Sequence, residues 1–104
     1  MNLLKYVYDE LAEINCCFTH QEFSRKYLGQ SGDYYCCLNL TGDFPSADAM
    51  LNLWEELIKE REKYVRLLSQ SQCAQEQEIF GGWIAIYKRL ADEVFSSLEN
   101  HGSA

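Results

Sequence analysis

The sequence predicts an all-α protein in which three helices in the N-terminal part are followed by a long C-terminal helical hairpin. Apolar residues recur at a spacing of three to four over most of the chain, which is typical of amphipathic helices. With 104 residues, 47% of them hydrophobic, the chain has the size of one globular domain. We therefore expect a single domain over residues 1–104, with a tri-helical part at 1–42, long helices at 46–100 and a frayed tail at 101–104.

The first helix is expected over residues 2–14, with Asn2 as its cap. Its apolar positions alternate with charged ones at helical spacing, and they are Leu3, Leu4, Val7, Tyr8, Leu11 and Ile14.

A second helix is expected from Thr19 to about Leu28. Thr19 and Glu22 have the spacing of a capping box, and Phe18 and Phe23 stand at the two positions of a hydrophobic staple. Gly29 then supplies the left-handed residue that commonly ends a helix.

Residues 32–40 are expected to form a third helix, capped by Ser31 and ended by Gly42 and Pro45. The run from Tyr34 to Leu38 has the aromatic content of a strand, so a strand is the alternative for these residues. We prefer a helix because an isolated strand would have no partner in an otherwise helical chain.

Ser46 is expected to cap a long fourth helix, and polar residues 69–72 predict an end or a kink. The apolar stripe of this helix consists of Met50, Leu53, Trp54, Leu57, Ile58, Tyr64, Val65 and Leu68. Gly81 and Gly82 predict a helix boundary or a close approach of another element, because each glycine costs a helix about 1 kcal/mol. A last helix is expected from Trp83 to about Asn100.

The composition limits the partners and the compartment. The net charge of −7 disfavours a polyanion such as DNA, and it favours solubility, a basic protein partner or mimicry of a nucleic acid. No run approaches the roughly 18 apolar residues of a membrane span, so no membrane association is expected. Five cysteines, four of them in neighbouring pairs, suit reduced thiols in the cytoplasm better than a disulfide framework. A chain this short buries a modest core, which leaves a homodimer open.

We expect no metal, no cofactor and no catalytic residue. His20 and His101 accompany the paired cysteines, but neighbouring side chains on a helix diverge by about 100 degrees, so Cys36 and Cys37 do not suit one zinc ion. Cys16 and Cys17 precede a helix start that would acidify them, but the sequence supplies neither a base nor an orienting group.

The segment from Thr19 to Leu40, a capped helix, a glycine turn and a short helix, resembles the helix-turn-helix of small prokaryotic regulators. The spacing departs from that motif, because one more residue than usual separates Phe23 from the turn glycine. The stretch 23–31, followed by Tyr34 and Tyr35, also resembles small uncharacterised bacterial proteins. These resemblances imply a bacterial or mobile-element origin.

The helix-turn-helix resemblance implies DNA binding by residues 32–39 in the major groove. Phosphate contacts would then fall to Lys5, Arg25 and Lys26. Bases would be read by Gln30, Ser31 and Asn39, together with the tyrosines of the same segment. Residues 32–39 contain no Lys or Arg, however, and Asp33 would face the phosphates. Protein contacts are therefore the preferred role of this unit.

Aromatic residues are too numerous for one small core, and tyrosine and tryptophan are enriched in interface hot spots. The expected contact residues are Asp33, Tyr34, Tyr35 and Phe44. Our hypothesis is a non-enzymatic regulator or inhibitor, an acidic phage or mobile-element protein that occludes a nucleic-acid-binding target. The alternative is a dimeric helix-turn-helix transcriptional regulator.

Overall fold

The computed structural model describes residues 3–14, 19–42 and 44–102, and the side chains among them up to residue 99. Its elements are α1 (Leu3–Ile14), α2 (His20–Glu22), the π-helical turn η1 (Phe23–Tyr27), α3 (Tyr34–Thr41), α4 (Ala47–Gln70) and α5 (Ala74–Gly102). The described part of the chain contains no strand, which confirms the all-α prediction and the choice of a helix for α3.

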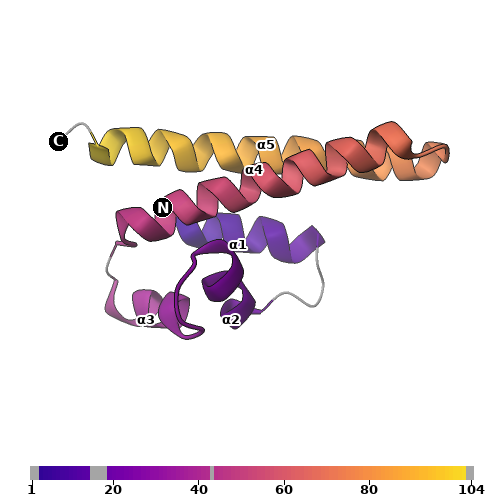
Figure 1. Ribbon diagram of the computed structural model, residues 1–104. Helices are drawn as coiled ribbons and strands as arrows, with labels where there is room; N and C mark the ends of the chain where they lie inside the picture. Colours follow the sequence, from indigo (N-terminus) through magenta and orange to yellow (C-terminus); the bar gives the residue numbers. More distant parts are fainter. Residues whose placement is uncertain (1–2, 15–18, 43, 103–104) are drawn as a thin grey trace.

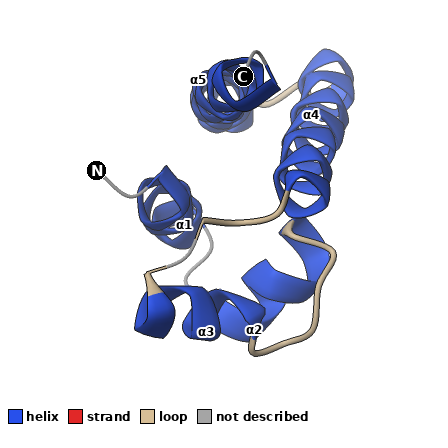
Figure 2. Cartoon of the chain, turned by 90° about the vertical axis from the view of Figure 1, so that its left-hand side faces the viewer, coloured by secondary structure: helices blue, strands red, loops and turns tan. Residues whose placement is uncertain are grey.

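The two long helices α4 and α5 form the expected hairpin, and the N-terminal elements lie along one side of it (Figure 1). Figure 2 shows α1 beneath α5, with α3 and α2 at the bottom of the view, below α1 and α4. The hairpin tip extends beyond the end of α1, which gives the molecule extents of 47 × 31 × 21 Å. The tip of the hairpin is therefore covered less than its base.

The core lies where α1 and η1 meet the base of the hairpin, residues 49–57 of α4 and 87–94 of α5. Its apolar members come from every element except the short α2, and they are Leu4, Val7, Leu11, Phe23, Tyr27, Leu28, Tyr35, Ala49, Met50, Leu53, Leu57, Tyr87, Leu90, Ala91 and Val94. The expected stripe of α4 is buried at Met50, Leu53 and Leu57, whereas Val65 near the tip is exposed.

The second helix begins as expected and ends in a wider turn. The amide of Glu22 donates to Thr19 Oγ1 at 3.1 Å, and Gly29 has a φ of 64°. Between them, the amide of Leu28 donates to the carbonyl oxygen of Phe23 at 3.1 Å, five residues back along the chain. Such a π-helical turn accommodates one extra residue in a helix. The surplus residue between Phe23 and Gly29 is absorbed in this turn.

The prediction that Ser31 caps the third helix is wrong. Helix α3 begins at Tyr34, with Asp33 at the cap position, and the Ser31 hydroxyl instead donates to Asp33 Oδ1 at 2.8 Å. The buried Ser24 hydroxyl of η1 accepts from the amide of Tyr35 at 3.0 Å. A partner from another element thus satisfies an amide in the first turn of α3, which a local cap would otherwise satisfy.

The long helices follow their predicted boundaries except at the glycine pair. The Ser46 hydroxyl accepts from the amide of Ala49 at 3.2 Å, and residues 71–73 separate α4 from α5. Helix α5 is continuous through Gly81 and Gly82, and a Cβ added at either would meet nothing within 4 Å. The expected boundary or close approach is therefore wrong, because packing against α4 along the helix outweighs the local glycine penalty.

Two end regions complete the comparison with the predicted elements. The backbone of α5 extends to Gly102, past the expected end at Asn100. The predictions for Asn2, Phe18, Cys16 and Cys17 lie outside the described residues.

Candidate functional site

The four expected contact residues occupy different environments around α3. Asp33 and Phe44 are exposed, and Phe44 has 81% of its surface in solvent. Tyr34 is half-buried, and its hydroxyl accepts from the amide of Ser46 at 3.0 Å, which fastens α3 to the start of α4. Tyr35 is only 2% exposed and packs in the core, so its assignment as a contact residue is corrected.

Tyr35 is buried because the N-terminal elements build an aromatic cluster around it. Its ring lies 5.0 Å from the ring of Phe23 and 5.5 Å from that of Tyr8, measured between centroids. Burial also raises the pKa of the Tyr35 hydroxyl. The buried side chain that anchors α3 is therefore Tyr35. The exposed residues of α3 are Cys36, Cys37, Asn39, Leu40 and Thr41.

An exposed apolar pair flanks the turn after α3. Leu40, at 87%, and Phe44, at 81%, are the most exposed of the large apolar residues that the structure describes. They lie on either side of Gly42, whose φ of 72° ends the helix. Leu40 was missed in the sequence because apolar residues occur on several sides of α3, so their spacing does not indicate which of them are buried. We call Asp33, Leu40 and Phe44 the α3 face.

The α3 face belongs to a long stretch of the sequence without cations. Residues 27–58 contain no Lys or Arg. The same stretch carries five acidic residues, which are Asp33, Asp43, Asp48, Glu55 and Glu56. The stretch includes all of α3 and the first half of α4, so these elements contribute acidic side chains and no cation.

Two of the three cations proposed for phosphate contacts are engaged within the chain. Lys5 Nζ lies 2.9 Å from Asp9 Oδ2, and Lys26 Nζ lies 2.9 Å from Glu60 Oε1. The exposed Arg25 places its guanidinium against Gly32, where an added Cβ would lie 2.9 Å from Nη2. A DNA phosphate would have to compete with these carboxylates.

The residues proposed to read bases are spread over the turn and α3. Gln30 is half-buried, whereas Ser31 and Asn39 are exposed. Ser31 already donates to Asp33, and Asn39 makes a side-chain hydrogen bond with Tyr35. Reading a base would require Ser31 and Asn39 to exchange these internal bonds for new ones.

The fold brings together a cysteine and a histidine that are distant in the sequence. His20 Nδ1 lies 3.4 Å from Cys36 Sγ, and both residues are exposed. The His20 ring makes edge contacts with Tyr8 and Tyr35, with centroids 4.7 Å and 5.0 Å apart. Sequence spacing gave no signal for this pair, because it forms only when α3 folds against α2.

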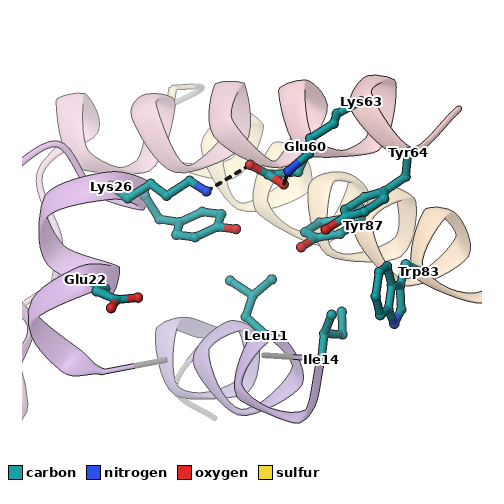
Figure 3. Close-up of a pocket in the computed structure, with 10 residues that line it drawn as sticks. Leu11, Ile14, Glu22, Lys26, Glu60, Lys63, Tyr64, Trp83 and Tyr87 are labelled. Atoms are coloured by element: carbon teal, nitrogen blue, oxygen red, sulfur yellow. Dashed lines mark ion pairs between the residues drawn. The ribbon is translucent and has the colours of Figure 1, made fainter. Parts of the chain in front are cut away.

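A pocket of about 260 Å³ lies in the corner between the N-terminal elements and the hairpin (Figure 3). Residues from α1, α2, η1, α4 and α5 line it, and they are Leu11, Ile14, Glu22, Lys26, Tyr27, Glu60, Lys63, Tyr64, Trp83 and Tyr87. The side chain of Glu60 is only 12% exposed and pairs with Lys26, while Lys63 Nζ lies 3.9 Å away on the other side. The pocket therefore combines aromatic walls with one largely buried carboxylate.

Two buried tyrosine hydroxyls lie near that carboxylate. Burial raises the pKa of Tyr27, and the neighbouring Tyr87 and Glu60 raise it further. Burial likewise raises the pKa of Tyr87 to about 12, and the hydrogen bond with Tyr27 works in the opposite direction. Both phenols therefore stay neutral near pH 7.

Other kinds of site find no support within the ranges that the structure describes. No group of three or more His, Cys, Asp or Glu side chains there is arranged to hold a metal ion. None of the helices there is long and apolar enough to cross a membrane.

A family model described as a family of unknown function (DUF6626) matches residues 4–102 of the chain. No curated protein and no solved structure matches the chain.

Proposed function

We propose that this chain, which belongs to the family of unknown function DUF6626, is a non-enzymatic regulator or inhibitor that binds a basic protein through its α3 face. The observation that carries the proposal is the exposure of Leu40 and Phe44, on either side of Gly42, in a stretch of the sequence without cations. Contiguous exposed apolar patches rimmed by polar residues mark protein contact sites, and we propose that Leu40 and Phe44 form such a patch.

The charge pattern favours a cationic partner surface. Five acidic residues lie between positions 27 and 58, and they would steer a basic surface toward the apolar pair. Proteins that bind nucleic acids carry such surfaces. Occlusion is the proposed mechanism: the anionic module covers the surface that would otherwise bind phosphates. An acidic phage or mobile-element inhibitor would work in this way.

The thiols support a reducing compartment, and we propose that the protein acts in the cytoplasm. Cys36, Cys37 and Cys73 are free and exposed in the part of the chain described by the structure. Exposed free thiols persist where disulfides are kept reduced.

Affinity capture with matched variants tests the proposal. The immobilised chain is exposed to a lysate of the organism that encodes it, after nuclease treatment, and retained proteins are eluted with salt. We expect a basic protein that binds wild type and the Phe95→Ser variant but not the Leu40→Ser/Phe44→Ser variant. Phe95 is the control because it is an exposed aromatic residue on α5, away from α3. Adding wild-type chain should then displace nucleic acid from the purified partner.

Two results would reject this function. One is a retained protein that binds the Leu40→Ser/Phe44→Ser variant as well as wild type. The other is specific retention of DNA that weakens steeply with salt and is lost in Arg25→Ala, which would favour the transcriptional regulator instead.

A further inference from the structure

We propose that the pocket between η1 and the hairpin binds an organic cation, either a quaternary ammonium or a guanidinium group. This inference goes beyond the α3 face, because none of Asp33, Leu40 and Phe44 lines the pocket. It rests on three features. Aromatic rings line the pocket, one largely buried carboxylate lies among them, and two lysines place their ammonium groups near both the rings and that carboxylate.

The aromatic walls form a corner. The rings of Tyr64 and Tyr87 stack at 15° with centroids 5.7 Å apart, and the ring of Trp83 meets Tyr64 at 68° with a centroid distance of 5.0 Å. Tyr27 of η1 also lines the pocket. Aromatic rings that surround a site in this way attract cations through the negative faces of their π systems.

Two lysines already place their ammonium groups near these rings. Lys26 Nζ lies 5.4 Å from the centre of the Tyr27 ring while it pairs with Glu60. Lys63 Nζ lies 5.2 Å from the centre of the Tyr64 ring and 3.9 Å from Glu60. Both ammonium groups approach the site from its rim, because their side chains are 52% and 53% exposed.

A ligand cation would replace a lysine rather than add to it. The exposed lysines are free to swing into solvent at small cost, because an ammonium group is well hydrated there. Glu60 lacks that freedom, since its side chain is only 12% exposed. A quaternary ammonium or guanidinium group loses less hydration on entering an aromatic site than a lysine does, so it is the better occupant of the interior.

Titration by nuclear magnetic resonance tests the proposal, with tetramethylammonium chloride and N-acetylarginine amide as separate probes and sodium chloride as the ionic-strength control. The indole N–H signal of Trp83 should shift on titration, and that of Trp54, which packs against Phe95, should stay in place. Tighter binding of tetramethylammonium assigns the site to a free quaternary amine. Tighter binding of the arginine derivative assigns it to a basic side chain of a protein.

Charge-matched variants separate the site from the general field of the protein. Glu60→Gln should abolish the Trp83 shift, whereas Glu56→Gln, which removes an ion-paired carboxylate from the preceding turn of α4, should retain it. Lys26→Ala removes the internal competitor and should tighten binding by about two- to five-fold relative to Lys88→Ala, which removes the same charge elsewhere. Trp83→Leu should weaken binding by a similar factor, read from the other pocket signals.

Three outcomes would overturn the proposal. The first is a Trp83 signal that neither probe shifts more than sodium chloride does. The second is a shift that persists in Glu60→Gln, provided that the variant keeps its helical circular dichroism. The third is equal affinity in Lys26→Ala and Lys88→Ala, since the lysine would then not occupy the ligand's place.

Discussion

Alanine substitutions at three open glycines test the backbone of the structure with one chemical change. Gly81 and Gly82 lie inside the continuous helix α5, and Gly42 ends α3 with a φ of 72°. An added Cβ would meet nothing within 4 Å at any of the three, so no packing term enters. Gly81→Ala and Gly82→Ala should each stabilise the protein by about 0.8–1 kcal/mol, which is the helix-propensity difference. Gly42→Ala should destabilise it by about 1–2 kcal/mol, because alanine is strained in the left-handed region.

Urea denaturation followed by circular dichroism measures the three variants against wild type. In a chain of 104 residues, each α5 substitution should also raise the melting temperature by about 4 °C. A loss of stability in Gly81→Ala or Gly82→Ala would refute the reasoning. It would mean either that α5 is broken at the glycine pair or that another chain packs there in solution. No change in Gly42→Ala would refute the left-handed end of α3.

Three further perturbations test the N-terminal packing. Ser24→Ala should cost about 1–3 kcal/mol in urea denaturation, because the buried amide of Tyr35 loses its acceptor; a neutral effect would contradict that hydrogen bond. Asn52→Ala should cost a similar amount, because Nδ2 donates to the carbonyl oxygen of Tyr27 at 2.7 Å. Unchanged stability would contradict this hydrogen bond between α4 and η1. The contribution of Tyr87 to the free energy of unfolding should fall between pH 10 and about 12, because its folded-state pKa is raised above its ordinary value; a Tyr87→Phe variant that loses as much stability over that range as wild type would contradict the buried hydroxyl.

Much of the fold could be predicted because several helix ends are fixed by neighbouring residues. Thr19 and Ser46 each cap a helix by accepting from the amide three residues further on, and Gly29 and Gly42 adopt the left-handed backbone expected at a helix end. The start of α3 could not be predicted in this way. The position of this helix start depends on the Ser24 hydroxyl, which accepts from the amide of Tyr35, 11 residues further along the chain.

The candidate sites were harder to predict than the helices, because a site depends on which side chains are exposed in the folded chain. Phe44 was expected to be exposed from its place beside a turn, and it is. The local sequence does not show which of the neighbouring Tyr34 and Tyr35 is buried. Only the packing of Tyr35 against Phe23 in the folded chain identifies it as the buried one. The pocket and the His20–Cys36 pair each need elements that are distant in the sequence. Periodicity within one helix carries no information about them.

Stability alone gives a poor account of the polar groups at the pocket. Glu60, Tyr27 and Tyr87 lie beside an apolar core, where apolar residues of similar volume often stabilise a protein at least as well as a buried ion pair. Phenylalanine in place of either tyrosine would keep the ring packing and remove a buried hydroxyl. A fold selected only for its packing has no need of a carboxylate between two lysines at this corner. Lys26 offsets part of the cost of desolvating Glu60, and the proposed ligand cation would take over that role.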